Sequence, residues 1–351
     1  MLGPSISIGA RRIGGGERCF VIAEAGVNHN GSLDTAMDLV DVSAAAKADA
    51  VKFQTFDPDA LVIIGAPKAR YQAEQTGDSQ SQHAMLKGLS LPKSAYAELK
   101  RRAQKKGILF ISTPFEEQSA AFLNELDVPL FKIPSGEITN LPFLGHVAGF
   151  GKPMIISTGM STLSEVDTAV RCVRQAGNRD LILLHCVSSY PAPAADINLR
   201  AMNTLCVAFG VPVGYSDHIL GLEIAFAAVA LGASVIEKHF TLDRSMLGPD
   251  HQASLEPDEL TELVAGTRRV EDALGTGYKQ PAESEADTAS VARKSLVAAC
   301  DIPEAAVLLE SMLAIKRPGT GLPPAVKPFL VGRRARYAIA KDEVFTLEML
   351  L

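Results

Sequence analysis

Residues 235–240 read VIEKHF, an apolar run that ends in an acid, a base and a histidine. Burying an unpaired charge is costly, so these three side chains need partners or a binding site where the run ends. Side chains alternate along a strand, which predicts Glu237 and His239 on one face and Lys238 on the other. We therefore interpret His239 as a site residue, Glu237 as a neighbour that orients it, and Lys238 as half of a structural ion pair.

This stretch is the last of eight short apolar runs that alternate with amphipathic helical stretches. Eight such units over roughly 250 residues are typical of a (β/α)8 barrel, and near-continuous apolar strands agree, because a parallel barrel is buried on both faces. An open doubly wound sheet is the alternative, but EAGVNHNG is not the glycine-rich phosphate turn expected after its first strand. The runs are CFVIAEAG (19–26), AVKFQ (50–54), ILFIST (108–113), LFKIPS (130–135), PMIIST (153–158), LILLHC (181–186), VPVGYS (211–216) and SVIEKH (234–239).

The chain is expected to contain two domains. The barrel is predicted over residues 1–274. Residues 275–289 are polar, lack apolar periodicity and are predicted to form a linker. Residues 290–351 contain the short strands, prolines and glycines of a small β-rich domain. Within the barrel, the connection 57–91 is unusually long, which is more typical of a lid or binding loop than of a neutral connector.

Composition excludes several classes of protein. A net charge of -6 argues against a nucleic-acid or acidic membrane surface. The five cysteines are odd in number and form no CxxC pair, which favours a reducing cytoplasm over a disulfide framework or a zinc site. The N-terminus lacks an apolar core followed by a cleavage site, so no signal peptide is expected. Residues 219–236 are almost membrane-like, but Glu223 and two glycines favour a buried helix followed by a strand.

Polar residues follow all eight runs, and in such a barrel the C-terminal end of every strand faces the active site. Two ammonium groups among several hydroxyls suit a phosphate and a carboxylate together, which predicts a small dianionic or trianionic substrate. His218 and His239, at the ends of the last two runs, suit a divalent transition metal such as Mn²⁺. The anion-binding subset is Lys52, Thr113, Lys132, Ser135, Ser157 and Ser216, and the candidate acid/base or hydroxyl-binding carboxylates are Glu24, Glu137, Asp217 and Asp250.

Ten motifs run in order along essentially the whole chain: FVIAEAGVNHNGSLDTA, AVKFQTF, FISTPFE, FKIPSGE, IISTGM, HCVSSYP, GYSDH, IEKHF, GPDHQASLEP and IKRPGTG. Together they resemble the sialic acid synthase family, whose members make N-acetylneuraminate, legionaminate and related nonulosonic acids. The resemblance implies a (β/α)8 TIM barrel joined to a small antifreeze-like (SAF) domain, in a domain-swapped homodimer. It also implies condensation of phosphoenolpyruvate with an N-acetylated mannosamine-type sugar, release of phosphate, and a requirement for Mn²⁺ or Mg²⁺.

The resemblance also implies individual roles. His218 and His239 match metal ligands and Glu137 an acid/base carboxylate, while Glu24 and Asp217 are further candidate catalytic carboxylates. Arg317 matches an arginine that the partner's SAF domain inserts over the barrel mouth. The implied phosphoenolpyruvate contacts are Lys52, Thr113, Lys132, Ser135, Ser157, Ser188, Ser216 and Arg317, although some family members have Asn where this chain has Ser188. The implied sugar contacts are Glu24, Gln54, Phe115, Tyr190 and Asp250.

We interpret the chain as a cytoplasmic N-acetylneuraminate synthase. The alternative is a legionaminate or pseudaminate synthase that uses a 2,4-diacetamido-2,4,6-trideoxy hexose, and no residue decides between the two sugars. A different metal-dependent aldolase or phosphoenolpyruvate-dependent aldol synthase on the same fold is disfavoured by GPDHQASLEP and the tail motif. A non-enzymatic binding role is disfavoured by the complete set of polar strand ends.

Overall fold

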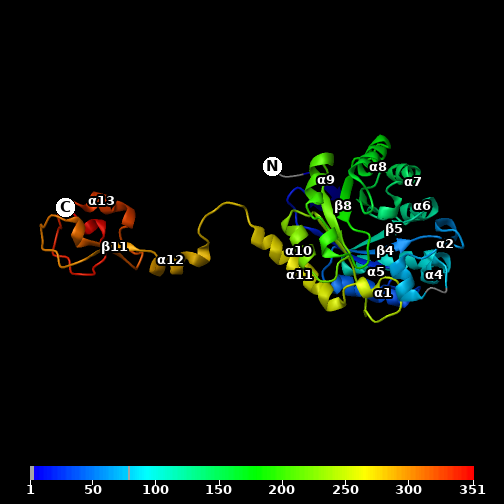
Figure 1. The fold of residues 1–351 in the computed structure, drawn as a ribbon, viewed down its shortest axis with the longest axis horizontal. Helices are drawn as coiled ribbons and strands as arrows, with labels where there is room; N and C mark the ends of the chain where they lie inside the picture. The colour runs from blue at the N-terminus through cyan, green and yellow to red at the C-terminus, as the bar shows by residue number, and fades with distance from the viewer. Residues whose placement is uncertain (1–3, 78–79) are drawn as a thin grey trace. The chain divides into compact units, whose positions relative to one another are not determined.

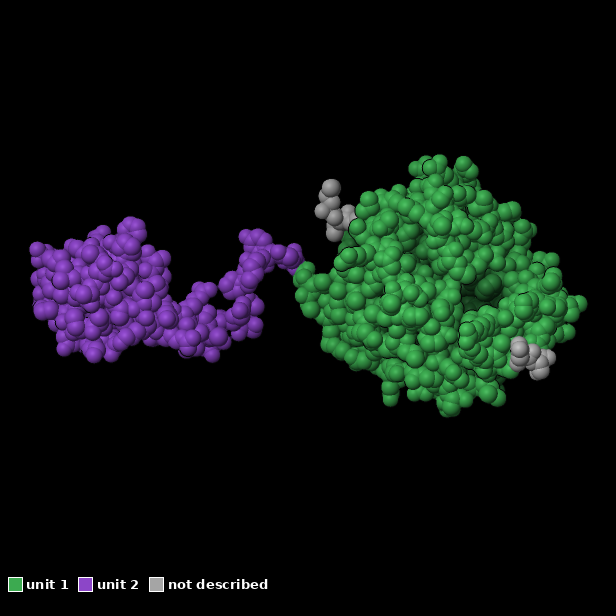
Figure 2. All heavy atoms as spheres, viewed as in Figure 1, with its two compact units in different colours: residues 1–275 green, residues 276–351 purple. Residues whose placement is uncertain are grey.

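The computed structural model describes residues 4–77 and 80–351. They fall into two compact units, residues 1–275 and residues 276–351, each with its own hydrophobic core (Figures 1 and 2). The division lies one residue beyond the predicted end of the barrel at Leu274. Figure 2 shows that the visible face of the first unit is deeply hollowed.

The first unit contains the predicted barrel of eight parallel strands (Figure 1). The strands follow one another in chain order, and β10 pairs with β3, so the last strand closes on the first. Between β5 and β6 the described residues form no ladder, although the two strands are neighbours. The strands are β3 (Phe20–Gly26), β4 (Ala50–Thr55), β5 (Leu109–Pro114), β6 (Phe131–Ile133), β7 (Met154–Ser157), β8 (Leu181–Cys186), β9 (Val213–Asp217) and β10 (Val235–His239).

Helices cover the outside of the strands (Figure 1), and local sequence signals set their ends. Thr162 and Glu165 form a capping box at the start of α8, and Gly107 ends α5 in the left-handed conformation, at φ 78°. Within the described residues no helix has the length and apolar character needed to cross a membrane. The outer helices are α1 (Leu33–Ala45), α5 (Lys93–Lys106), α6 (Glu117–Glu125), α7 (Leu141–Ala148), α8 (Leu163–Gln175), α9 (Ala201–Phe209), α10 (Glu223–Ala230) and α11 (Pro257–Leu274).

The barrel interior has an apolar lower layer and a polar upper one. An antiparallel hairpin, β1 (Ser5–Ile8) with β2 (Arg11–Gly14), packs its isoleucines against residues from the N-terminal halves of the strands, such as Phe20 and Ile22. This hairpin was not predicted from the sequence. It fills the N-terminal end of the barrel, so the open end is the C-terminal one, where Glu24 continues the inward face of β3 above Ile22.

The long connection between β4 and α5 is built from three short helices, α2 (Pro58–Leu61), α3 (Arg70–Thr76) and α4 (Gln82–Leu89). We call residues 57–91 the lid segment. Asp57 and Ser81 cap the first and last of these helices by accepting hydrogen bonds from backbone N–H groups.

The second unit is the small β-rich domain predicted for the C-terminus. Its paired strands are β11 (Ser295–Ala298) and β12 (Leu313–Lys316), which run antiparallel, and isolated bridges tie in residues as far as Leu350. The helices α12 (Ala286–Ala292) and α13 (Lys327–Leu330) belong to the same unit. Helix α12 begins inside the stretch predicted as a linker. The helix could not be predicted, because its sequence ADTASVA has no apolar stripe.

Candidate active site

A cavity of about 430 Å³ lies at the C-terminal ends of the strands, a volume suited to a small-molecule site. The strand ends form one part of its wall and the lid segment forms another. The cavity brings together fourteen of the predicted site residues: Glu24, Lys52, Gln54, Thr113, Phe115, Lys132, Ser135, Ser157, Ser188, Tyr190, Ser216, His218, His239 and Asp250.

Two lysines and two glutamates form a buried charge cluster in this cavity. Lys52 Nζ lies 2.9 Å from Glu24 Oε2 and 3.5 Å from Glu237 Oε2, and Lys132 Nζ lies 3.3 Å from Glu237 Oε1. All four side chains are at most 6% exposed. Ser216 Oγ also donates a hydrogen bond of 2.9 Å to Glu237 Oε1. Glu237 is therefore a central member of the site, between the two lysines, rather than the orienting neighbour of His239 that its strand position suggested.

The two glutamates differ in their electrostatic surroundings. Burial raises the pKa of Glu24 above its ordinary value, and the neighbouring Lys52 only partly offsets this. Burial acts in the same direction on Glu237, but Lys132 and Lys52 outweigh it and lower the pKa of that carboxyl. Glu237 is consequently the fixed anion of the cluster, whereas Glu24 can take up and release a proton near neutral pH.

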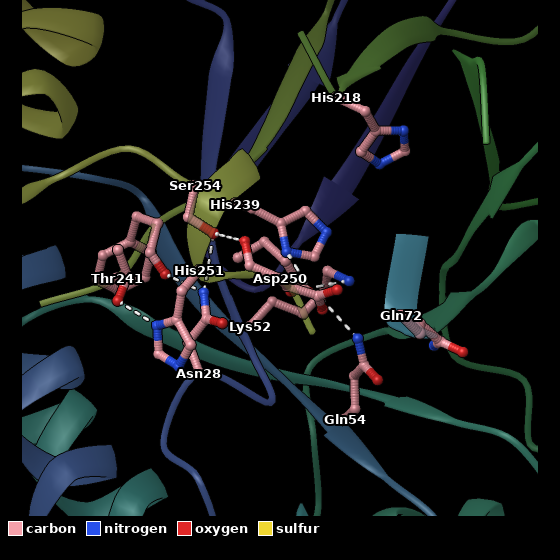
Figure 3. A network of polar contacts seen from close by, with 12 residues as sticks. Asn28, Lys52, Gln54, Gln72, His218, His239, Thr241, Asp250, His251 and Ser254 are labelled. Atoms are coloured by element: carbon pink, nitrogen blue, oxygen red, sulfur yellow. Dashed lines mark hydrogen bonds and ion pairs between the residues drawn. The ribbon is translucent and has the colours of Figure 1, made fainter. Parts of the chain in front are cut away.

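The two predicted metal ligands lie side by side, with ring centroids 5.7 Å apart (Figure 3). His218 Nδ1 is 2.7 Å from the backbone oxygen of Val187, so Nδ1 carries the proton and Nε2 keeps its lone pair. His239 Nδ1 is buried and has no hydrogen-bonding partner among the described residues. Burial lowers the pKa of both imidazoles, that of His218 to about 4, so both are neutral, as ligation requires.

These properties fit a divalent cation held by two imidazoles. Among the described residues, no group of three or more His, Cys, Asp and Glu side chains is placed to hold a metal ion. The chain itself therefore offers His218 and His239, and the remaining ligands would have to be water or substrate oxygens.

Asp250 lies on the other side of His239, with Oδ2 3.9 Å from His239 Nδ1 (Figure 3). Burial raises the pKa of Asp250 to about 6. A buried network holds its backbone: Ser254 Oγ donates to the Asp250 carbonyl at 2.6 Å, and Asn28 Nδ2 donates to Ser254 Oγ at 2.9 Å. Asn28 was not predicted as a site residue, although it lies in the quoted motif EAGVNHNG.

The lid segment contributes an apolar wall to the cavity. A small hydrophobic cluster, separate from the barrel core, lies beside the cavity, and all of its residues line the cavity. Tyr71 of α3 stacks on Tyr190 with centroids 5.0 Å apart, which joins the lid to the strand ends. The apolar wall comprises Val27, Phe56, Leu61, Met85, Leu86, Leu89 and Phe115.

Three predicted site residues lie outside this cavity. Asp217 points away from the strand-end histidines and accepts a hydrogen bond of 2.6 Å from Lys238, which gives Lys238 the structural ion pair predicted for it. Glu137 accepts a hydrogen bond of 2.7 Å from Asn140 and does not line the cavity. Arg317 belongs to the second unit, where it follows β12 and is exposed. We therefore correct the catalytic role predicted for Asp217, whose carboxylate is held by Lys238 away from the cavity, whereas the acid/base role of Glu137 stays a prediction.

The sequence pattern described as the NeuB family matches residues 39–279, and that of the SAF domain matches residues 293–351. The chain is 46% identical over 330 residues to the N,N'-diacetyllegionaminic acid synthase of Campylobacter jejuni, covering 93% of this chain and 99% of that protein. It is 37% identical to the human N-acetylneuraminate-9-phosphate synthase, over 97% of this chain and 94% of the human one.

Among solved structures, the fold is similar to N-acetylneuraminic acid synthetase from Leptospira borgpetersenii, solved in complex with citrate. The TM-score is 0.72 at 40% identity, and the match covers 82% of this chain and 95% of that one. The higher identity to a legionaminic acid synthase favours the alternative sugar over the N-acetylmannosamine of our first interpretation.

Proposed function

The chain belongs to the NeuB family of nonulosonic acid synthases, and from that premise we propose that it condenses phosphoenolpyruvate with a 2,4-diacetamido-2,4,6-trideoxy hexose to give a diacetyllegionaminic acid. The observation that carries the proposal is the cavity at the strand ends, which places two lysines and a row of hydroxyls beside two neutral imidazoles and an apolar wall. In the reaction, a carbon–carbon bond forms between phosphoenolpyruvate C3 and the sugar aldehyde carbon. Water then adds at C2, and the bond to phosphate breaks.

The phosphoenolpyruvate end of the cavity is its cationic and hydroxyl-rich part. Lys52 and Lys132 supply two positive charges, and Lys52 Nζ donates to Thr113 Oγ1 at 3.1 Å, which orients it. Ser157 Oγ is buried and has no hydrogen-bonding partner among the described residues, so it is available to a substrate oxygen. These groups would stabilise the charge that develops on the departing phosphate.

His218 and His239 are the groups that would hold Mn²⁺ or Mg²⁺, and a bound divalent cation would supply Lewis-acid polarisation of the sugar aldehyde. Glu24, beside Lys52 and with Oε1 3.3 Å from Gln54 Nε2, is the carboxyl best placed to exchange a proton with the sugar. Its raised pKa suits that task, because a group that titrates near the working pH both donates and accepts efficiently.

The apolar wall supports the choice of sugar. The reacting aldehyde must face the charged part of the cavity, so the far end of the sugar meets the side chains of the lid segment. The trideoxy sugar presents its C6 methyl and the methyl of its C4 acetamido group there, and each buried methyl is favourable by about 0.8 kcal/mol. N-acetylmannosamine would place hydroxyls against the same wall, and a buried hydroxyl without a partner costs roughly 1–3 kcal/mol.

Phosphate release from phosphoenolpyruvate, measured with Mn²⁺ and a panel of N-acetylated sugars, tests the proposed function. We expect turnover with the trideoxy sugar, at a kcat/KM about 10-fold above that with N-acetylmannosamine. No phosphate release with any sugar of the panel would contradict the synthase proposal. A preference for N-acetylmannosamine would instead restore N-acetylneuraminate synthesis as the activity.

A second prediction concerns the apolar wall itself. Replacing half-buried Leu86 with glutamine keeps the approximate size of the side chain but gives sugar hydroxyls a hydrogen-bonding partner. We expect the trideoxy preference, as a ratio of kcat/KM values, to fall by roughly 10-fold. The matched control is Ile63→Gln in the same segment, since Ile63 is 79% exposed and does not line the cavity. An unchanged ratio in Leu86→Gln would show that this wall does not select the sugar.

We also propose that two chains form a homodimer in which Arg317 of one subunit serves the barrel of the other. The proposal rests on the match of IKRPGTG to the family motif and on the SAF domain at residues 293–351. Among the described residues, no acceptor takes a hydrogen bond from the exposed Arg317 guanidinium, so it is available to a ligand. All five cysteines are free, which supports a reducing cytoplasm as the site of action.

A further inference from the structure

The last rung of the β9–β10 ladder carries a buried ion pair. Lys238 and Asp217 are paired in the register of the two parallel strands, and Lys238 Nζ lies 2.6 Å from Asp217 Oδ2. Both side chains are only 1% exposed. The pair therefore joins two neighbouring strands at the point where each of them ends.

The hydrogen bonds of this pair are made with neighbouring side chains and backbone groups of the protein, and none of these partners lines the cavity. Asp217 Oδ1 accepts hydrogen bonds from Tyr215 OH at 3.2 Å and from the backbone N–H of Ile219 at 3.0 Å. Lys238 Nζ also donates to the Ile219 carbonyl at 2.5 Å. The three polar side chains thus fix both strand ends and the first turn of the chain after β9.

The residues that follow the pair are the two imidazoles. His218 comes directly after Asp217, and His239 directly after Lys238. Because side chains alternate along a strand, the pair lies on the outer face of the barrel and the histidines on the inner face. Any slip between the ends of β9 and β10 would change the separation of the rings, whose centroids are 5.7 Å apart.

We propose that the Asp217–Lys238 pair is a positioning device that sets the separation of His218 and His239 for a divalent cation. The inference rests on the metal role assigned to these histidines. A buried ion pair is a weak source of stability, since an apolar pair of similar volume often replaces it at no cost. The pair instead contributes geometric specificity. A charged, hydrogen-bonded contact fixes one register between β9 and β10, whereas an apolar contact would tolerate several.

The test compares Mn²⁺ binding with folding in a double variant, Asp217→Leu/Lys238→Met, which removes both charges together and leaves neither one buried alone. Mn²⁺ affinity is measured by calorimetry on the full chain without substrate, and folding by thermal denaturation. We expect cooperative unfolding, a Kd for Mn²⁺ raised at least 10-fold, and an altered Mn²⁺ electron paramagnetic resonance spectrum. The control Asp41→Leu/Arg102→Met removes an ion pair between α1 and α5, and should leave Mn²⁺ binding unchanged.

A double variant that folds and binds Mn²⁺ with the affinity of the original chain would overturn the proposal. If that variant fails to fold, Asp217→Asn/Lys238→Gln keeps hydrogen-bonding groups at both positions and is judged by the same measurement. His239→Ala, which removes a ligand outright, should abolish measurable binding. Mn²⁺ binding that survives His239→Ala would overturn the metal assignment and the positioning role with it, while leaving the synthase proposal to the phosphate-release assay.

Discussion

Lys52→Met should lower the kcat of the synthase reaction by about 100-fold to 1,000-fold. Among the described residues, Lys52 is the cation that contacts both Glu24 and Glu237, and it also donates a hydrogen bond to Thr113. Its loss removes a charge from the predicted phosphoenolpyruvate site, and removal of one such group from a preorganised site costs about 100-fold to 1,000-fold in kcat. It also leaves two buried carboxylates with one lysine between them. Breaking a buried pair in this way destabilises a protein by roughly 3–5 kcal/mol.

The loss of stability should depend on pH in a defined direction. Burial already raises the pKa of Glu24, and Lys52 is the main group that opposes this, so the pKa rises further in the variant. A carboxyl with a raised folded pKa binds more protons folded than unfolded, so the stability of the variant falls as pH rises above the ordinary value of about 4.3. The deficit in Tm relative to the original chain should therefore be larger at pH 8 than at pH 5.

Lys52→Arg is the matched control, because it keeps the charge and changes only its shape. It should recover most of the stability and little of the activity, since a planar guanidinium does not reproduce the contacts of an ammonium group. A Lys52→Met protein that is as stable at pH 8 as at pH 5, relative to the original chain, would show that Glu24 is not held by this lysine.

The barrel and most of the site could be predicted from the sequence because both follow from one pattern. Each apolar run specifies a buried strand, and its last polar residues then lie at the C-terminal end of the barrel. Asp217 shows that lying at the end of a strand does not by itself place a side chain in the active site. Alternation along VIEKHF places Lys238 on the outer face, where the structure pairs it with Asp217. The same rule places Ser216 and His218 of YSDH inward and Asp217 outward, so the outward position of Asp217 follows from the sequence as well.

Other features could not be predicted because they depend on contacts between distant segments. The charge balance of Glu237 arises from lysines 185 and 105 residues away in the chain, which only the closed barrel brings within 3.5 Å. The helices of the lid segment are short, so its sequence gives no sustained periodic signal. Its apolar wall exists only because Met85 and Leu89 pack against Phe56 and Val27. That wall is also the feature that bears on the identity of the sugar.

Arg317→Ala and His239→Ala should each be nearly inactive alone and should restore activity when mixed. The first variant lacks the predicted cation of the SAF domain, and the second lacks a predicted metal ligand of the barrel. If each site combines the barrel of one subunit with Arg317 of the other, a mixed dimer contains one site with both defects and one intact site. Random exchange then yields about one quarter of the original activity, because half of the dimers are mixed and half of their sites are intact.

The exchange must be shown independently of activity. The two variants carry different affinity tags and are mixed under conditions that permit subunit exchange. The mixed dimer is then isolated by using the two tags in series. Phosphate release is assayed before and after this isolation. The isolated mixed dimer should have about half the activity of the original protein. A mixed dimer that is isolated but inactive would mean that Arg317 serves its own barrel, because both sites of that dimer would then carry one defect each. An Arg317→Ala protein with full activity would remove the arginine from the site altogether and leave the cations of the cavity, Lys52 and Lys132, to bind the phosphate without it.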